Sequence, residues 1–206
     1  MNKYFITGIG TDVGKTVASA IVVEALKADY WKPIQAGELQ HSDTHSVQEL
    51  ISNSKSYMHE HSYALQTPMS PHAAAEIDGI HIELDAITEP KTENHLVIEG
   101  AGGLLVPIND SETVLDLIKD DYKIIVVSRH YLGSINHTLL TLSELRKRGL
   151  EPSGIIFNGA AHSSTEAIIK KMGNVLEIGR IDEEEVVDRH IIKTYAELFK
   201  SPLEAL

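Results

Sequence analysis

The sequence predicts a single α/β domain in which helices flank a mainly parallel central sheet as a three-layer sandwich. Short runs of β-branched residues alternate with helix-length amphipathic stretches, which is the pattern of successive β-α-β units. A length of 206 residues is enough for one domain with a sizeable core. We therefore expect residues 1–206 to form one domain.

Start and stop signals place the elements along the chain. A glycine-rich turn precedes the first helical stretch, and a glycine follows each of two later ones. We expect strands at about residues 4–7, 30–33, 96–99, 123–128, 154–158 and 174–178. We expect helices at residues 15–28, 134–148 and 164–172, and a solvated helix start at the acidic run 183–185. Residues 35–93 are less regular and are expected to form loops and helices of the same domain.

Charge and composition exclude several classes of protein. A formal net charge of -12 argues against a nucleic-acid-binding protein, because such a protein needs a basic surface to release counterions from phosphates. The chain has no cysteine, which excludes disulfides and thiolate metal sites and is compatible with a reducing cytosol. No apolar run is long enough for a bilayer and no signal-peptide core is present. We expect a soluble, cytoplasmic protein without a membrane partner.

A glycine-rich turn between the first strand and the first helix predicts a phosphate-binding site. The turn contains Gly8, Gly10, Thr11, Asp12, Val13 and Gly14, and Lys15 and Thr16 follow it. It would place backbone N–H groups and the positive end of a helix around phosphates, with Lys15 at the β- and γ-oxygens and Thr16 on Mg²⁺. Such a turn can also merely start a helix, but the strand before it and the helix after it favour nucleotide binding.

Polar residues at the ends of later strands extend this prediction. In an open α/β sheet the ligand binds beyond the carboxyl ends of the strands. Lys32 leaves the second strand there and can aim a second ammonium at the phosphates, although an isolated lysine is usually a surface residue. Glu99 ends the third strand before a run of glycines, and a carboxylate at this point suits Mg²⁺, although the run alone could be a flexible turn. Asp43 offers a second carboxylate from a polar loop that could otherwise be solvated.

Taken together, these motifs resemble the dethiobiotin synthetase family. The resemblance covers most of residues 1–160 and rests on residues 8–16, 32–37, 42–43, 70–72, 99–103, 132–137 and Asn158. It implies a fold like that of the P-loop nucleotide hydrolases and an ATP- and Mg²⁺-dependent enzyme. The implied reaction joins 7,8-diaminononanoate and CO₂ to give dethiobiotin, ADP and phosphate. It runs through a carbamate, whose oxygen attacks the γ-phosphate, and the second amine then closes the ring.

The resemblance also implies a role for each matching residue. Lys15 and Lys32 would be the electrostatic catalysts, which fits a reaction whose nucleophiles belong to the substrate. The implied Mg²⁺ ligands are Thr16, Asp43 and Glu99. The implied nucleotide contacts are the residues of the glycine-rich turn together with Lys15, Thr16, Glu99, Gly102 and Asn158. Of these, Asn158 would recognise the adenine. The implied substrate contacts are Thr11, Lys32, Ala36, Gly133, Ser134, Ile135 and Asn136.

The last four substrate contacts imply a homodimer. In the family, this helix start comes from the neighbouring subunit and holds the carboxylate of the substrate, which suits the free N–H groups of a helix N-terminus. An N-cap at Ser134 is the plainer interpretation of the same residues. Two departures from the family are Ala36, where a hydroxyl residue is common, and the turn formed by residues 179–182, which leaves the base selectivity open.

Three other functions are compatible with a phosphate loop. The main alternative is a regulatory ATPase of the partitioning or septum-positioning type, but such proteins carry an extra lysine early in the loop where this chain has Gly10. An amidoligase would bring a glutaminase domain, for which no sequence remains. A pure nucleotide-binding module would leave Lys32 and Asp43 unexplained. His41, His45, His59 and His61 lie near one another in sequence, but they lack the spacing of a zinc site.

Overall fold

The computed structural model describes residues 1–206 and consists of alternating strands and helices. The strands are β1 (Lys3–Gly8), β2 (Asp29–Trp31), β3 (Ile34–Ala36), β4 (Tyr63–Leu65), β5 (Leu96–Gly103), β6 (Tyr122–Arg129), β7 (Pro152–Asn158) and β8 (Glu177–Ile181). The α-helices are α1 (Lys15–Leu26), α2 (Asp43–Leu50), α3 (Pro71–Asp78), α4 (Ser134–Lys147), α5 (Ser163–Gly173) and α6 (Arg189–Glu204). Three short 3₁₀ helices are η1 (Leu39–His41), η2 (Leu84–Ala86) and η3 (Val114–Leu117).

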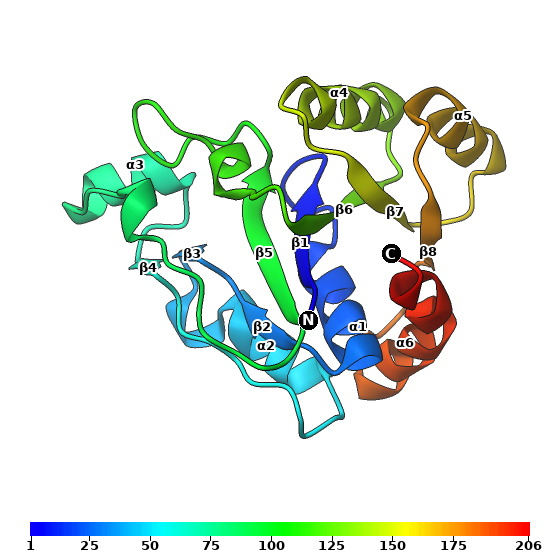
Figure 1. The fold of residues 1–206 in the computed structure, drawn as a ribbon, viewed down its shortest axis with the longest axis horizontal. Coiled ribbons are helices and arrows are strands. Elements are labelled where there is room, and N and C mark those ends of the chain that lie inside the picture. The colour runs from blue at the N-terminus through cyan, green and yellow to red at the C-terminus, as the bar shows by residue number, and fades with distance from the viewer.

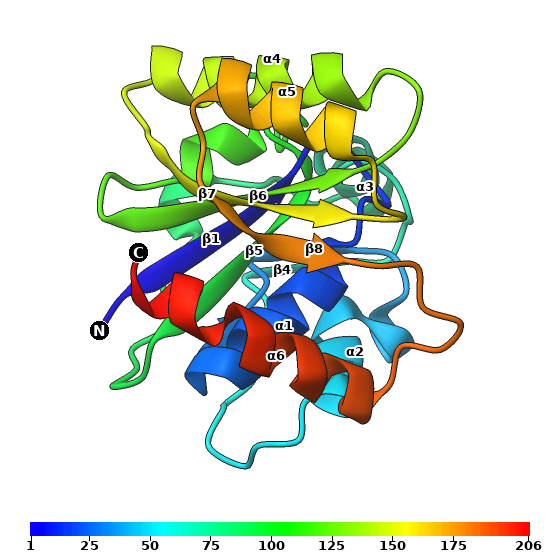
Figure 2. The same ribbon diagram turned by 90° about the vertical axis from the view of Figure 1, so that its right-hand side faces the viewer.

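Six strands form one central sheet, and two helical layers cover its faces. The strand order is β2-β5-β1-β6-β7-β8, and every neighbouring pair runs parallel. Helices α4 and α5 lie on one face, and α1, α2 and α6 lie on the other (Figures 1 and 2). β3 and β4 pair separately as a small parallel sheet. This arrangement confirms the predicted α/β sandwich with a mainly parallel sheet.

The central strands are apolar along their whole length because both of their faces are covered. On β1, Tyr4 and Ile6 belong to the core between the sheet and helices α1 and α6, whereas Phe5 belongs to the core on the opposite face. Successive side chains of a strand point to opposite faces, so one short strand serves both cores. The same alternation decides which residues of β2 and β5 reach the functional site.

Several sequence-based boundaries differ from the structure. The third strand was expected to end at Glu99, but β5 continues through the following glycines to Gly103. The last strand was expected at residues 174–178 but is β8 (Glu177–Ile181), because Asn174 takes a left-handed conformation (φ 42°) that ends α5 and delays the strand. β2 ends at Trp31, before Pro33, which has no N–H for a ladder bond. The acidic run at residues 183–185 does not start a helix. α6 instead begins after Asp188, whose side chain accepts hydrogen bonds from the N–H groups of His190 and Ile191.

Helix α6 closes the sheet by packing an apolar face against α1 and β8. Phe199 is 3% exposed in this contact. A Cβ atom added to Gly179 of β8 would lie 2.2 Å from the Phe199 ring, so only glycine lets the ring approach the strand this closely. No helix of the protein combines the length and the apolar character needed to cross a bilayer.

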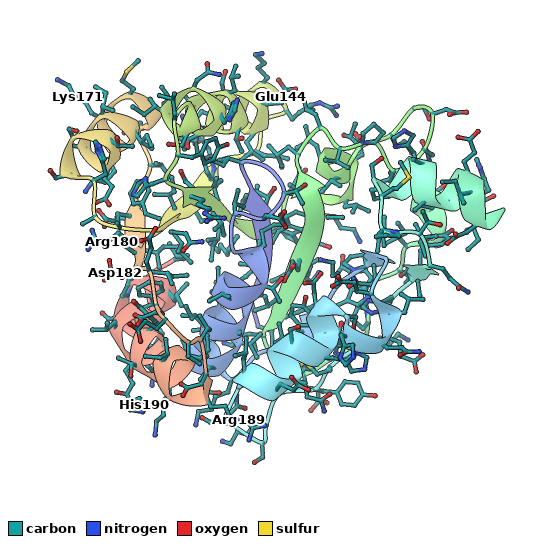
Figure 3. The ribbon with its side chains drawn as sticks, turned by 180° about the vertical axis from the view of Figure 1, so that it is seen from behind. Glu144, Lys171, Arg180, Asp182, Arg189 and His190 are labelled. Carbon is teal, nitrogen blue, oxygen red and sulfur yellow. The ribbon has the colours of Figure 1, made fainter.

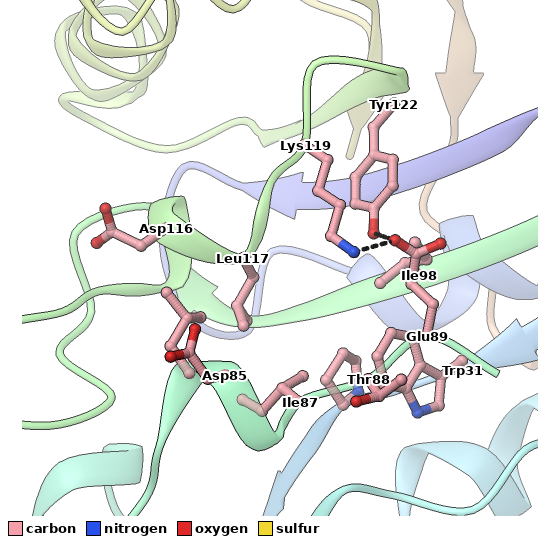
Figure 4. A pocket seen from close by; sticks show the side chains of 12 residues that line it. Trp31, Asp85, Ile87, Thr88, Glu89, Ile98, Asp116, Leu117, Lys119 and Tyr122 are labelled. Atoms are coloured by element: carbon pink, nitrogen blue, oxygen red, sulfur yellow. Dashed lines mark hydrogen bonds and ion pairs between the residues drawn. The ribbon is translucent and has the colours of Figure 1, made fainter.

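A cavity of about 560 Å³ lies under the β2–β5 edge of the sheet, where the short helices η2 and η3 and the loops beside them cover it (Figure 4). Trp31 and Ile98 line its apolar part, and Glu89 forms part of its polar wall. Glu89 accepts a hydrogen bond from Tyr122 (2.7 Å) and pairs with Lys3 (2.7 Å) and Lys119. Burial opposes ionisation of Glu89, but these partners outweigh it and lower the pKa of its carboxyl from 4.5 to about 2.

We predict that replacing Phe199 by alanine lowers the free energy of unfolding by about 3 to 5 kcal/mol, because it removes buried apolar surface and leaves a cavity over Gly179. Leu198→Ala is the matched control, since Leu198 is 65% exposed on the same helix. Urea denaturation of both variants measures the difference. Equal losses in the two variants would contradict the packing described for α6.

We predict that the ion pairs of Glu89 stabilise the protein at neutral pH and not in acid. The folded-state pKa lies below the unfolded value, so this contribution is present above pH 4.5 and is lost as the pH falls towards 2. Glu89→Gln should therefore lower the free energy of unfolding by about 1 to 2 kcal/mol at pH 7, and the deficit should shrink below pH 4.5. Denaturation across this pH range, with the exposed Glu93→Gln variant as control, tests it; a constant deficit would refute it.

Candidate active site

The turn between β1 and α1 has the shape of a phosphate-binding loop. Gly14 takes a left-handed conformation (φ 93°) at the N-cap of α1, and no side chain caps this helix start, which leaves its N–H groups for an anion. A Cβ atom on Gly8 would lie 2.5 Å from Val13, so the tight turn needs glycine there. Lys15 folds back and donates a hydrogen bond to the carbonyl of Gly10 (2.9 Å). Burial lowers the pKa of the Lys15 ammonium from 10.5 to about 8.

Two carboxylates converge on Thr16 at the start of α1. The Thr16 hydroxyl lies 2.7 Å from Asp43 Oδ1 and 3.1 Å from Glu99 Oε1. Glu99 comes from β5, and Asp43 is the first residue of α2, which is capped by Ser42. Three elements that are distant in sequence thus bring three oxygen-bearing side chains to one point.

Lys32 holds the two carboxylates together. Its ammonium donates hydrogen bonds to Glu99 Oε1 (3.0 Å) and to Asp43 Oδ2. Burial opposes the charge on Lys32, but attraction to Glu99 and Asp43 outweighs it and raises the pKa of the ammonium above its usual value. The same partnership lowers the pKa of the Asp43 carboxyl, although burial opposes this. Lys32 and Asp43 are therefore charged at neutral pH.

Two residues that the sequence analysis did not single out fix the orientation of Glu99. Ser19 and Tyr30 donate hydrogen bonds of 2.8 Å and 2.9 Å to Glu99 Oε2, which leaves Oε1 to face Thr16 and Lys32. Burial and the Glu99 charge raise the pKa of Tyr30 well above 10, so its hydroxyl remains a donor. Tyr30 lies two residues before Lys32 and Ser19 lies three after Thr16. These are the strand and helix spacings that place side chains on one face.

A cavity of about 600 Å³ lies at the carboxyl ends of β1, β2 and β5, and Thr16, Lys32, Asp43 and Glu99 border it. The expected site residues that line it are Thr11, Asp12, Val13, Gly14, Lys15, Thr16, Lys32, Ala36, Asp43, Glu99 and Gly102. Gln35, Glu38 and residues 68–71 also line it and were not expected. Gln35 is a positioning residue, because its amide accepts from Asp43 N (3.3 Å) and donates to Gly37 O (3.1 Å).

Asn158 lies behind the phosphate loop, at the carboxyl end of β7. Its side-chain N–H donates to the carbonyl of Val13 (2.9 Å), and a Cβ atom on Gly14 would lie 2.3 Å from the same nitrogen. The Asn158 amide nitrogen therefore supports the loop, and its oxygen and second N–H remain without a partner.

Residues 133–136 do not border the cavity. Gly133 is the N-cap of α4 with φ 103°, and Ser134 is the first helical residue, so an N-cap at Ser134 is wrong. Left-handed backbone at this point requires the flexibility of glycine. The preceding Leu132 is fully exposed, and Tyr131 is 42% exposed. The start of α4 thus lies beside the exposed apolar side chains of Tyr131 and Leu132, and it lies outside the cavity at the phosphate loop.

Arg180 and Asp182 lie in the turn at the end of β8, where the sequence departs from the family (Figure 3). Ion pairs hold this turn. Arg180 donates to Asp182 (2.8 Å) and pairs with Glu166 of α5 (3.3 Å). Glu166 also lies 3.0 Å from the His130 ring. The guanidinium is thus occupied by two carboxylates of its own chain.

The donor set around Thr16 fits Mg²⁺. A hydroxyl and two carboxylates offer only oxygen atoms, which are the ligands that this hard cation takes. No sulfur or imidazole ligand stands beside them, since Thr16 contacts only the two carboxylates. In this structure the two carboxylates are held by Lys32 and by the Thr16 hydroxyl.

Comparisons with known proteins identify the family to which this chain belongs. A family model described as an AAA domain matches residues 2–190. The ATP-dependent dethiobiotin synthetase of Christiangramia forsetii is 60% identical over 98% of this chain and 97% of its own length. The enzyme of the same name from Cytophaga hutchinsonii is 48% identical, over 95% of this chain and 96% of its own.

Solved structures show the fold at much lower identity. The septum site-determining protein MinD of Pyrococcus horikoshii, complexed with Mg-ADP, has a TM-score of 0.60 at 15% identity, over 98% of this chain and 95% of its own. A plasmid partition protein of Borrelia burgdorferi has a TM-score of 0.57 at 16% identity, over the whole length of both chains. These likenesses place the fold among the P-loop nucleotide hydrolases. With the identities above, the chain belongs to the family of ATP-dependent dethiobiotin synthetases.

Proposed function

We propose that this protein is an ATP- and Mg²⁺-dependent cyclo-ligase that converts 7,8-diaminononanoate and CO₂ to dethiobiotin, with ADP and phosphate as the other products. The observation that carries the proposal is the convergence of Lys15, Lys32, Thr16, Asp43 and Glu99 on one cavity at the phosphate loop. In the proposed route the substrate forms a carbamate and then a mixed carbamic–phosphoric anhydride, which the second amine closes to a ring.

The protein contributes position and charge to this reaction. ATP would supply the phosphoryl group, and Thr16, Asp43 and Glu99 would hold a Mg²⁺ ion that neutralises the charge on its oxygens. The substrate supplies both nucleophiles, so the cavity needs no nucleophilic side chain of its own. Lys15 faces the phosphates with the N–H groups of the α1 start, and their negative charge favours the protonated ammonium against the burial that lowers its pKa.

Lys32 has two tasks in this proposal. Without ligands, its ammonium balances Asp43 and Glu99. Asp43 and Glu99 would also hold the metal, and the Lys32 ammonium would then be free of these carboxylates. It would turn to the carbamate and the γ-phosphate, which gain negative charge as the reaction proceeds.

We further propose that the active unit is a homodimer in which the start of α4 serves the partner's cavity. The free N–H groups at Ile135 and Asn136 suit the carboxylate of the substrate, whereas the N–H of Ser134 donates to the carbonyl of Tyr131 (3.0 Å). They lie outside the cavity of their own chain. The exposed Leu132 and Tyr131 beside them offer the apolar surface that an interface between two copies would bury.

The switch ATPase remains the main rival, because its members have the same fold. A membrane-binding switch would need a free amphipathic segment. The apolar face of the terminal helix α6, including Ile192, Phe199 and Leu203, is instead buried within the protein. This observation favours the enzyme.

We predict that single-turnover incubation with the diamine, bicarbonate and Mg-ATP yields a cyclic urea detectable by mass spectrometry. Lys15→Gln and Lys32→Gln should each lower turnover by orders of magnitude, because a preorganised charge at the phosphoryl group is lost. Circular dichroism should show an intact fold. Lys55→Gln, which changes an exposed lysine outside the cavity, should keep normal turnover.

A second readout separates the two tasks of Lys32. In the nucleotide-free protein, Lys32→Gln should bind Mn²⁺ more tightly than the unchanged protein, because no ammonium competes for Asp43 and Glu99; spin-resonance titration measures this. ATP hydrolysis stimulated by a protein or membrane, with no urea product, would instead support the switch. Near-normal turnover of either cavity lysine variant would disprove its catalytic role.

We predict that Leu132→Asp produces a monomer in sedimentation experiments and loses affinity for the diamine while it still binds nucleotide. A charge at the proposed interface opposes its burial, and the cavity then lacks the partner's helix start. Leu176→Asp, at another exposed leucine, is the control. A Leu132→Asp variant that remains a dimer, or a monomer with full substrate affinity, would contradict the shared site.

A further inference from the structure

Glu38 is an unusual residue on the wall of the cavity. It borders the same space as Lys15 and Lys32, and it is exposed to that space and to solvent. Its backbone is left-handed (φ 51°), directly after the left-handed Gly37 (φ 75°). Glutamate has no preference for this conformation, since its Cβ atom crowds the following carbonyl.

The surrounding turn holds this backbone in place. Gly37 N donates to the carbonyl of Leu65 (2.8 Å), and a Cβ atom at Gly37 would lie 2.5 Å from Pro68. The carbonyl of Glu38 accepts from His41 N (2.9 Å) at the start of η1. Glycine would meet the same conformational demand at residue 38 without strain. Strained residues that persist in a binding site point to a use for their side chain.

The side chain of Glu38 forms no hydrogen bond or ion pair within the protein. Four carboxylates line the cavity, and two of them, Asp43 and Glu99, are paired with Lys32. Asp12 and Glu38 are not paired. When Lys15 and Lys32 face phosphate and carbamate, these two remain as uncompensated negative charges. A ligand with positive charge is therefore expected beside them.

We propose that Glu38 is a specificity-determining residue that binds an ammonium group of the diamine substrate. This inference rests on the proposed function and adds one contact to it. Two neighbouring ammonium groups repel each other, so a vicinal diamine gives up one proton readily, and a nearby carboxylate keeps the remaining proton on the amine that it faces. Glu38 thereby leaves the other amine free to take up CO₂. It also supplies a polar contact close to Ala36, where the family often has a hydroxyl.

The test compares Glu38→Gln with the unchanged protein in the presence of Mg²⁺ and a non-hydrolysable ATP analogue. Calorimetric titration with 7,8-diaminononanoate should show roughly tenfold weaker binding to the variant, the size expected for loss of a charge-assisted hydrogen bond. The affinity for the ATP analogue should not change. In turnover, KM for the diamine should rise by a similar factor while KM for ATP stays constant. Glu49→Gln, an exposed carboxylate on α2 outside the cavity, is the matched control.

Two further measurements separate binding from structure. Glu38→Gly should bind the diamine as weakly as Glu38→Gln and should have an equal or higher melting temperature, because glycine relieves the left-handed backbone. The analogues that lack one amine, 7-aminononanoate and 8-aminononanoate, should differ in affinity for the unchanged protein. They should become nearly equal for Glu38→Gln.

The outcomes are distinct. If the unchanged protein forms product and Glu38→Gln binds the diamine equally well, Glu38 has no such role. If only Asp12→Asn weakens diamine binding, the ammonium faces the phosphate loop and the assignment to Glu38 is wrong. A lower melting temperature for Glu38→Gly with unchanged diamine affinity would assign a structural role. An unchanged protein that forms no product and binds no diamine would overturn the proposed function itself.

Discussion

The ion triad of Lys32, Asp43 and Glu99 is the interaction on which the site depends. It joins the end of β2, the start of α2 and the middle of β5, and Thr16 connects it to the phosphate loop. Lys32 and Glu99 are buried, and breaking a buried ion pair by removing one partner costs about 3 to 5 kcal/mol because the other charge is left uncompensated. The triad therefore holds the loop after β2 against the sheet in the absence of ligand. The same three side chains, Lys32, Asp43 and Glu99, are needed in the proposed reaction.

The parallel sheet makes this convergence possible. All six strands point the same way, so β1, β2 and β5 deliver the glycine loop, Lys32 and Glu99 to one edge. Strand alternation then divides the side chains between the two faces. Tyr30 points to the site and supports Glu99, whereas Trp31 and Ile98 line the cavity beneath the sheet. Mutations at these two apolar positions would thus reach Lys32 and Glu99 through the backbone without touching any ligand.

The sequence alone predicted the architecture and the deepest part of the site, because both follow from local rules. Lys15 and Thr16 are specified by a glycine turn between a strand and a helix, and Glu99 by its place before a run of glycines, although β5 continues past it to Gly103. Tyr30 and Ser19 could have been found from spacing, but nothing local says that their hydroxyl groups meet the same carboxylate oxygen. Glu38 could not be found, since a left-handed glutamate has no sequence signature. The delayed start of β8 follows likewise from the conformation of one residue, Asn174.

Electrostatics also explains how an acidic protein can hold an anionic nucleotide. The net charge of -12 repels phosphates at long range, and four carboxylates face two lysines inside the cavity. Attraction is thus confined to the helix start at Gly14 and to Lys15, and it acts only at contact. The remaining acidity is useful if the other reactants are cations. Mg²⁺ matches Asp43 and Glu99, and a protonated diamine matches the unpaired carboxylates, so each cation offsets part of the negative charge of the cavity. Each cation thereby lowers the repulsion that an anionic nucleotide meets in the cavity.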